Sequence, residues 1–272
     1  TRSPTVTGVQ TCALPISMDI IAGRNPVKEA LAARAASDFE RILVASSPGA
    51  KKSGSNPINM IISEARSKGI DVEFAHIDEL TRMSCDIPHQ GVIAIVKEYK
   101  YAELSDILDK AAASGEPPFI IIADGIEDPH NLGAIIRSAE TAGAHGIIIP
   151  KRRAAGINAT VAKGAAGATE YLPCMRVSNI SNIIETLKDK GLWIAACDMG
   201  GTIYHKQDLS GPIALVVGSE GKGVSRLVRE KCDFIVSIPL CGKVNSLNAS
   251  NAAAIISPTR SEERRVGKEC RS

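Results

Sequence analysis

Residues 119–150 read FIIIADGIEDPHNLGAIIRSAETAGAHGIIIP, and this stretch decides the fold. Two short apolar runs, at 119–124 and 146–150, flank a segment with helical character at about 131–142. A continuous apolar run is typical of a strand buried on both faces, and a helix between two such runs connects parallel strands. The stretch therefore predicts one unit of a parallel sheet that helices cover on both sides.

The same alternation continues downstream of this unit. Further apolar strands are expected at 192–198, 212–218 and 233–239. Helical segments are expected between them, at 179–190 and 222–231. Together with residues 119–150 these elements predict a C-terminal α/β domain over residues 118–257.

Residues 18–98 predict a second, smaller α/β domain. Strands are expected at 41–46, 71–76 and 91–99, and helices at 77–83 and after the Asn-Pro pairs 25–26 and 56–57. Proline is well placed in a first helical turn, so we expect Asn25 to cap the first of these helices. Residues 99–117 are polar and end in Pro, and we expect a linker there with one short helix.

The two ends of the chain lack the hydrophobic period of the rest. Residues 1–17 and 258–272 resemble translated sequencing-library adapter, so we interpret them as artefacts and Met18 as the start. Without these ends the net charge falls from +2 to about −1. Net charge therefore does not indicate a nucleic-acid partner, which would need local basic patches.

Composition excludes several classes of protein. Aromatic residues make up only 3% of the chain, so the base-stacking platforms of single-strand binders are not expected. No apolar run approaches the roughly 20 residues of a membrane span, and no signal peptide is recognisable. The seven cysteines form no C-x-x-C pair, which predicts free thiols in the cytoplasm and no zinc site or other metal.

Three polar clusters follow predicted strands, where open parallel sheets bind their ligands. The first follows 119–124: Asp128 and Pro129 turn the chain, Asn131 can cap, and Gly133 allows close approach. Arg137 is then the one basic residue of an apolar helix. Its residue type fits a snorkelling surface side chain as well as a functional one.

The second cluster is VVGSEGKGVSR, residues 216–226. A glycine loop before a helix suggests phosphate binding, but the dinucleotide fingerprint follows the first strand of its domain and has another glycine spacing. Glu220 inside the loop would also repel phosphate. The loop therefore favours an uncharged ring against its backbone, with Glu220 facing a cation or a polar group.

The third cluster lies in CGKVNSLNASNAAAI, residues 241–255, which places Asn245, Ser246, Asn248, Ser250 and Asn251 before an apolar helix. A single such residue is enough to cap a helix. The excess of amides and hydroxyls favours a binding or catalytic site over capping alone.

Taken together, DPHNLGAIIR, VVGSEGKGVSRL and SIPLCGKVNSLNASNAA resemble the three motifs of the SpoU, or TrmH-like, group of the SPOUT methyltransferases. GRNPVKEAL and IPHQGVIA resemble the ribosomal-protein-like substrate domain of its RlmB-type members, which methylate the ribose 2′-oxygen of a guanosine in 23S rRNA. The resemblance implies a deep trefoil knot, S-adenosylmethionine bound in the knot loops, an RNA substrate and a homodimer. It implies no DNA substrate.

Residue by residue, the resemblance assigns cofactor contacts to Gly218, Ile238 and Leu247. It assigns catalysis to Asn131, Arg137, Glu220, Ser246 and Asn248. In the family the arginine is proposed as the base that deprotonates the 2′-hydroxyl. Because the pKa of arginine exceeds about 12, a clamp on phosphate or on the developing alkoxide is the chemically easier role, and both roles stay open.

RNA contacts are expected from the basic residues that follow strand 146–150, namely Lys151, Arg152, Arg153 and, further on, Lys163. Lys51 and Lys52 fit plain solvated surface. His89 and Gln90 fit either RNA contact or a turn, and Asn251 a contact on the helix face. Asn245 has no assignment.

Two alternatives remain open: a 2′-O-methyltransferase acting on tRNA or another rRNA site, and a non-catalytic RNA-binding protein. The N-terminal domain favours rRNA, and the intact catalytic set opposes a mere binder. Pro258 interrupts the last helix, which in the family packs against the partner subunit, so we expect a weak dimer.

Overall fold

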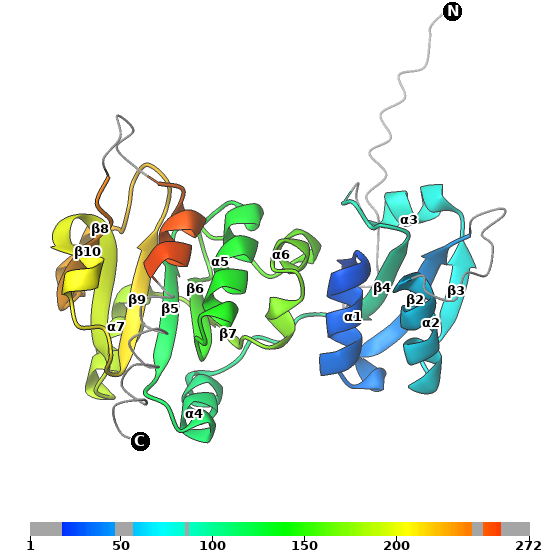
Figure 1. Ribbon diagram of the computed structural model, residues 1–272, viewed down its shortest axis with the longest axis horizontal. Coiled ribbons are helices and arrows are strands. Elements are labelled where there is room, and N and C mark those ends of the chain that lie inside the picture. The colour runs from blue at the N-terminus through cyan, green and yellow to red at the C-terminus, as the bar shows by residue number, and fades with distance from the viewer. Residues whose placement is uncertain (1–17, 47–56, 85–86, 241–246, 257–272) are drawn as a thin grey trace, which may run out of the picture.

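The computed structural model describes residues 18–46, 57–84, 87–240 and 247–256. Figure 1 shows two α/β domains side by side, the N-terminal domain in blue and cyan and the C-terminal domain in green to red. The predicted fold class, a parallel-sheet domain preceded by a small α/β domain, is confirmed.

The N-terminal domain has a four-stranded mixed sheet in the order β1-β4-β2-β3 within the described residues. β4 is antiparallel to both β1 and β2, whereas β2 and β3 are parallel. The strands are β1 (Met18–Ala22), β2 (Phe39–Ala45), β3 (Val72–Ala75) and β4 (Val92–Lys97). The helices are α1 (Arg24–Ala33), α2 (Pro57–Ser67) and α3 (Ile77–Met83), with a 3-10 turn η1 (Ala36–Asp38).

Apolar side chains on the two faces of this sheet make two small cores. Leu31 of α1 and Ile61 of α2 pack with Ile42 on one face. Leu80 of α3 packs with Ile93 on the other face. Alternation along β2 and β4 thus fixes which face each helix covers.

The C-terminal domain has a parallel sheet, six-stranded in the part of the chain described, in the order β10-β8-β9-β5-β6-β7. Its strands are β5 (Phe119–Asp124), β6 (Gly146–Pro150), β7 (Cys174–Val177), β8 (Trp193–Ile203), β9 (Ile213–Gly218) and β10 (Phe234–Ser237). Its helices are α4 (Leu104–Ser114), α5 (Pro129–Thr141), α6 (Ala159–Gly164), α7 (Ile180–Asp189) and α8 (Arg226–Lys231), and residues 249–256 form a further helix. Two 3-10 turns, η2 (Ala168–Glu170) and η3 (Tyr204–Lys206), complete the domain.

Helices cover both faces of this sheet, as its apolar strands predict. Ile121 faces one core with α5, α6 and helix 249–256. Its neighbours Ile120 and Ile122 face the other core with α4, α7 and α8. Figure 1 shows helix 249–256, in orange-red, on the same side of the sheet as α5.

Several elements differ from the expectation. β1, β7 and α6 were not predicted, because MDIIA and CMRV are short and ATVAKG has no amphipathic period. α1 begins at Arg24 with Gly23 as its N-cap, so the prediction that Asn25 caps it is wrong. The knot stays a prediction, since residues 241–246 lie outside the described residues.

Residues 99–117, expected as a linker, contain the predicted helix but are packed into the C-terminal domain. The Tyr101 hydroxyl accepts a hydrogen bond from the Ile157 N–H at 3.0 Å. Ala102 pairs with Met175 beside β7. Ile107 of α4 is buried against the sheet, and a Cβ on Gly146 would lie 2.6 Å from it. The segment is therefore packed against the C-terminal domain over much of its length.

Candidate active site

The loops that follow β5 and β9 meet the start of helix 249–256 at one edge of the parallel sheet. Asn131 Nδ2 donates to Glu220 Oε1 at 2.8 Å. Asn248 Nδ2 donates to Asn131 Oδ1 at 2.9 Å and also to Glu220 Oε1. Three of the predicted catalytic residues, more than a hundred positions apart at the extremes, thus form one hydrogen-bonded group, which we call the amide–carboxylate cluster.

Some of these polar residues cap helices, and others bind the cluster. Asp128, and not Asn131, caps α5, because its carboxylate accepts the His130 N–H at 2.9 Å. This arrangement frees the Asn131 amide for Glu220. Asn248 does both tasks, since its Oδ1 accepts the Ser250 N–H at 2.9 Å while its Nδ2 binds the cluster.

Glycine spacing shapes the turn that carries Glu220. Ser219 and Gly223 pair across the turn, with N–H to carbonyl distances of 3.1 and 2.9 Å. Gly221 and Gly223 adopt φ of +80° and +63°, a region that favours glycine. The returning strand of the turn lies against Gly218, where a Cβ would sit 2.1 Å from the Gly223 carbonyl carbon.

This turn also explains why the helix predicted from residue 222 begins later, at Arg226. The positive φ angles of Gly221 and Gly223 are incompatible with a helix. Beyond the turn, the Ser225 N–H donates to Asp124 Oδ2 at the end of β5, at 2.8 Å. The loop is thereby fixed at both ends.

A cavity opens beside the cluster. Gly218, Ile238 and Leu247, the three residues predicted to contact a cofactor, all line it. Its remaining wall is mostly apolar or backbone, and two carboxylates, Asp198 and Glu220, border it; the other lining residues include Val217, Ser219, Gly221, Gly223, Leu240, Ala249 and Ala252. Pockets of this composition suit a small molecule with an apolar ring and a few polar groups.

Sequence reasoning missed Asp198 as a site residue. Its side chain is 15% exposed, lies 3.6 Å from the Arg229 guanidinium and accepts the Met199 N–H at 2.7 Å. The signal was present, since Asp198 is the last residue of the predicted strand 192–198, at the same sheet edge as the other clusters.

The Cys197 thiol also lines this cavity. Burial, together with the neighbouring Asp198 charge, raises the pKa of Cys197 to about 12. The thiol therefore stays protonated at neutral pH, and a thiolate nucleophile is not available here.

A second, more polar hollow lies on the other side of Glu220. It is lined by Gly125, Ile126, Glu127, Asp128, Asn131, Ser219, Glu220 and Lys222. Ser219, Glu220 and Lys222 line both hollows, so the cluster stands between them. A group held in either hollow reaches Glu220.

Two family models match this chain. Residues 118–257 match the SpoU rRNA Methylase family, and residues 20–102 match the family described as RNA 2′-O ribose methyltransferase substrate binding. The chain belongs to the SpoU rRNA methylase family. It is an RNA methyltransferase of SpoU/TrmH type.

Two relatives of this SpoU methylase come from Bacillus subtilis and Staphylococcus saprophyticus. It is 47% identical to the putative TrmH family tRNA/rRNA methyltransferase YacO of Bacillus subtilis, over 72% of this chain and 79% of that protein. It is 43% identical to a putative TrmH family tRNA/rRNA methyltransferase of Staphylococcus saprophyticus, over 87% and 92%.

A solved structure shares its fold. The SpoU methyltransferase AviRb from Streptomyces viridochromogenes, crystallised in complex with AdoMet, superposes with a TM-score of 0.74. The two chains are 24% identical, and the match covers 92% of each. At this identity the likeness shows the fold alone.

Arg137 is not part of the cluster of this SpoU methylase. It lies on α5 six residues after Asn131, which at about 100° per residue places it on a different side of the helix. Its side chain is exposed, and no hydrogen bond or ion pair joins it to the cluster among the residues described. Its catalytic role stays a prediction.

The predicted RNA contacts fall into two groups. Lys151, Arg152 and Arg153 are exposed in the bend after β6, with Arg153 at φ +56°. Lys163 of α6 instead donates from its ammonium to the Pro88 carbonyl of the N-terminal domain. Ser246, Lys51 and Lys52 lie outside the described residues.

His89 and Gln90, for which the sequence left an RNA contact or a turn open, lie in a turn that side-chain hydrogen bonds stabilise. Gln90 adopts φ +53°, and its side-chain oxygen accepts the Arg24 N–H at 3.2 Å. His89 is buried, and its Nδ1 accepts the Gly91 N–H at 3.1 Å. Burial, and then the Lys163 charge, lower the pKa of His89, which favours this neutral acceptor.

Within the described ranges, no group of three or more His, Cys, Asp or Glu side chains has an arrangement that could hold a metal ion. No helix in those ranges is both long and apolar enough to cross a bilayer.

Proposed function

We propose that this SpoU methylase transfers a methyl group from S-adenosylmethionine to the ribose 2′-oxygen of a guanosine in 23S rRNA, acting as a homodimer. One observation carries the proposal: the amide–carboxylate cluster stands between two hollows that share Glu220. A donor in one hollow and an acceptor in the other would meet at the cluster. Such a two-sided arrangement suits group transfer better than simple binding.

The first cavity fits S-adenosylmethionine in its chemistry. Ile238, Leu240 and Leu247 offer apolar contact to an adenine ring, while Asp198 and Glu220 offer negative charge to the sulfonium and ammonium groups. Bare backbone at Gly218 and Gly223 lets the ring approach closely. When bound, the cofactor supplies an electrophilic methyl carbon.

The cluster itself orients Glu220. The Asn131 and Asn248 amides both donate to Oε1, so the carboxylate is held in one orientation. In the described part of the chain Oε2 makes no hydrogen bond. We assign it to a ribose hydroxyl in the second hollow, where it would accept the hydroxyl hydrogen and align the oxygen for in-line attack.

Basic residues supply the RNA side of the proposal. Arg137 would clamp a phosphate or stabilise the developing alkoxide, since a guanidinium with pKa above about 12 is a poor base. Lys151, Arg152 and Arg153 are exposed near the same edge and would contact phosphates.

The substrate assignment leans on the N-terminal domain. Its match to a family described as RNA 2′-O ribose methyltransferase substrate binding supports an RNA that is methylated on a ribose 2′-oxygen, and we assign that RNA to the ribosome. A tRNA or a different rRNA site is the second candidate, because the relatives are named for tRNA or rRNA.

The decisive experiment maps 2′-O-methylation across rRNA and tRNA from a bacterial strain that lacks its own enzyme, with and without this gene. We expect one added methyl group on a 23S rRNA guanosine, and none when Asn131→Ala or Glu220→Ala is expressed. A new methyl group in tRNA would select the second candidate. Binding to rRNA without any methylation would overturn the enzymatic proposal.

A further inference from the structure

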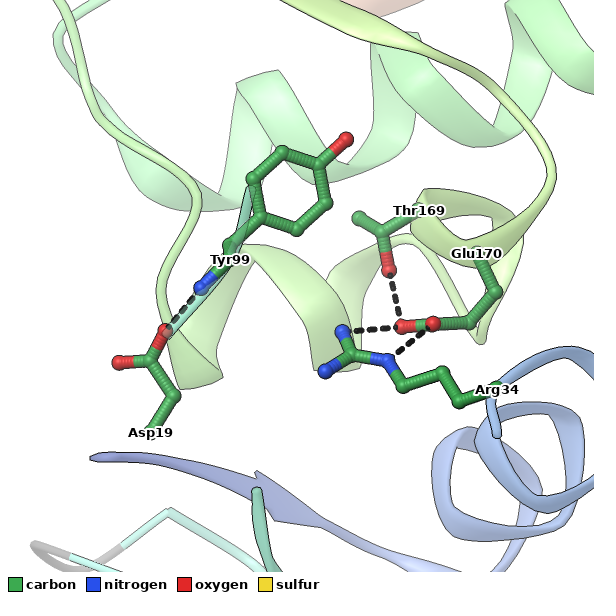
Figure 2. Close-up of polar contacts among 5 residues, drawn as sticks. All are labelled: Asp19, Arg34, Tyr99, Thr169 and Glu170. Carbon is green, nitrogen blue, oxygen red and sulfur yellow. Dashed lines mark hydrogen bonds and ion pairs between the residues drawn. The ribbon is translucent and has the colours of Figure 1, made fainter. Parts of the chain in front are cut away.

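A partly buried ion pair joins the two domains. Arg34, directly after α1, donates from Nη2 to Glu170 Oε1 at 2.8 Å and from Nε to Oε2 of the same carboxylate, as Figure 2 shows. The two side chains are only 16% and 5% exposed, and Thr169 Oγ1 donates to the carboxylate at 3.4 Å. Burial opposes the charge of Arg34, but the hydrogen bonds and charge of Glu170 outweigh it and raise the pKa of Arg34. The Arg34 guanidinium is therefore held in place by the carboxylate of Glu170.

Other contacts place the same segment of the C-terminal domain against the N-terminal domain. The Tyr171 hydroxyl donates to Glu29 Oε2 at 2.7 Å. A Cβ on Gly167 would lie 2.4 Å from Glu29 Cβ, so η2 and α1 are in direct contact. Asp19 of β1 accepts the Tyr99 N–H at 3.1 Å (Figure 2). Residues 159–171 thus form one wall of the junction.

The opposite side of that wall touches the helix that carries Asn131. A Cβ on Gly133 would lie 2.8 Å from the Val161 carbonyl oxygen and 3.0 Å from the Ala165 nitrogen, so α5 and α6 meet backbone to backbone. Gly133 is two residues beyond Asn131. One closely packed route therefore runs from α1 through η2 and α6 to the amide–carboxylate cluster.

We propose that Arg34 and Glu170 are a positioning pair, which holds the N-terminal domain in one orientation toward the cluster so that a structured RNA bound to that domain presents its target ribose there. The proposal rests on the proposed function. Domains joined in one chain move relative to each other unless their interface is fixed. A bidentate guanidinium–carboxylate contact is directional, and a buried one is intact only when both partners are in register.

This role separates two kinds of substrate. An RNA long enough to touch both domains depends on their relative orientation. A short hairpin that carries only the target nucleotide depends on the cluster and the cofactor cavity alone. Loss of the pair should therefore damage catalysis on the long RNA selectively, through misplacement of the ribose.

The test is made in the full-length chain. It compares wild type with Arg34→Glu, with Glu170→Arg and with the double variant that carries both substitutions. Lys231→Glu serves as the matched control, because it reverses a charge in an exposed ion pair with Glu185 far from the junction. Each variant is assayed for transfer to a long 23S rRNA fragment and to a hairpin cut from it, for S-adenosylmethionine affinity by calorimetry, and for domain separation by small-angle scattering.

We expect each single reversal to lower kcat/KM on the long fragment by about tenfold or more, with hairpin transfer and cofactor affinity changed less than about twofold. The double variant should recover most of the loss, because it restores opposite charges. An equal loss on both RNAs, or no loss on the long one, would overturn the positioning role.

Scattering keeps this inference separate from the proposed function. If the wild type methylates neither RNA, the proposed function fails. The domain separation measured by scattering then decides by itself whether the Arg34–Glu170 pair fixes the two domains. A broader distribution of domain separations in the single variants, which narrows to the wild-type width in the double variant, supports the pair as the contact that fixes the domains. Identical distributions in every variant would refute it.

Discussion

Gly218 lies so close to neighbouring backbone that the effect of substituting it can be predicted from the distances. In Gly218→Ala the new methyl group would lie 2.1 Å from the Gly223 carbonyl carbon and 2.2 Å from the Val224 nitrogen. Both are backbone atoms, so no side-chain rotation relieves the overlap. The turn that carries Glu220 would have to move away from β9, and the cofactor cavity would change shape with it.

The size of the effect follows from overpacking. Forcing an extra methyl group into a packed site costs about 1–3 kcal/mol, and rigid backbone neighbours favour the upper half of that range. At about 2–4 °C per kcal/mol for a chain of this size, the melting temperature should fall by roughly 5–10 °C. Cofactor affinity should fall about tenfold or more, equivalent to 1.4 kcal/mol or above.

Two other glycines provide matched controls. Gly211 has no atom within 4 Å of a built Cβ and no positive φ, so Gly211→Ala should stay within about 0.5 kcal/mol of wild type. Gly221 is equally open but has φ +80°, so Gly221→Ala should cost about 1–2 kcal/mol from backbone strain alone. Thermal unfolding and calorimetry with S-adenosylmethionine should rank the three variants 218, 221, 211. Equal melting and equal affinity of Gly218→Ala and Gly211→Ala would refute the reasoning.

Three further predictions concern the reaction. Arg137→Ala should lower methyl transfer about 100-fold or more while leaving cofactor affinity nearly unchanged, because Arg137 is exposed and is not among the residues that line the cofactor cavity. Equal loss of both would place Arg137 in the cofactor site. Replacing Lys151, Arg152 and Arg153 by alanine should weaken RNA binding and reduce its log–log salt slope by roughly 2–3, and an unchanged slope at unchanged affinity would make them plain surface. Cofactor binding should persist in excess chelator, because no candidate metal cluster occurs among the described residues, and strict dependence on a divalent ion would contradict this.

Much of the C-terminal domain was predictable because its strands are apolar and its loops are not. Ile120 and Ile121 face opposite cores, so the run 119–124 is apolar throughout, and a buried parallel strand is the simplest reading of such a run. The polar residues at the strand ends then had to share one edge of the sheet, which is why the polar clusters could be placed together. Within those clusters, the resemblance to the SpoU motifs is what selected Asn131, Glu220 and Asn248.

The remaining features depend on contacts that leave no local pattern. Helix α6 has mostly small residues besides Lys163, and its place is set by the close backbone approach at Gly133. The Arg34–Glu170 pair joins residues 136 positions apart, and neither position carries a motif. The cap of α5 was misassigned because Asp128 and Asn131 are both good capping residues. Only the geometry shows that the Asp128 carboxylate caps the helix while the Asn131 amide binds Glu220.

Asn248 connects helix 249–256 to the amide–carboxylate cluster, and these two tasks limit which residue types can occupy position 248. Its Oδ1 caps helix 249–256, and its Nδ2 donates to Asn131 and Glu220. Aspartate would cap equally well but would bring a second negative charge against Glu220, and serine would cap without a second amide donor. Glutamine has the right groups on a side chain one methylene too long. The order of helix 249–256 and the alignment of the Glu220 carboxylate therefore depend on each other through Asn248, so that fraying at the start of this helix would release the carboxylate from its orientation.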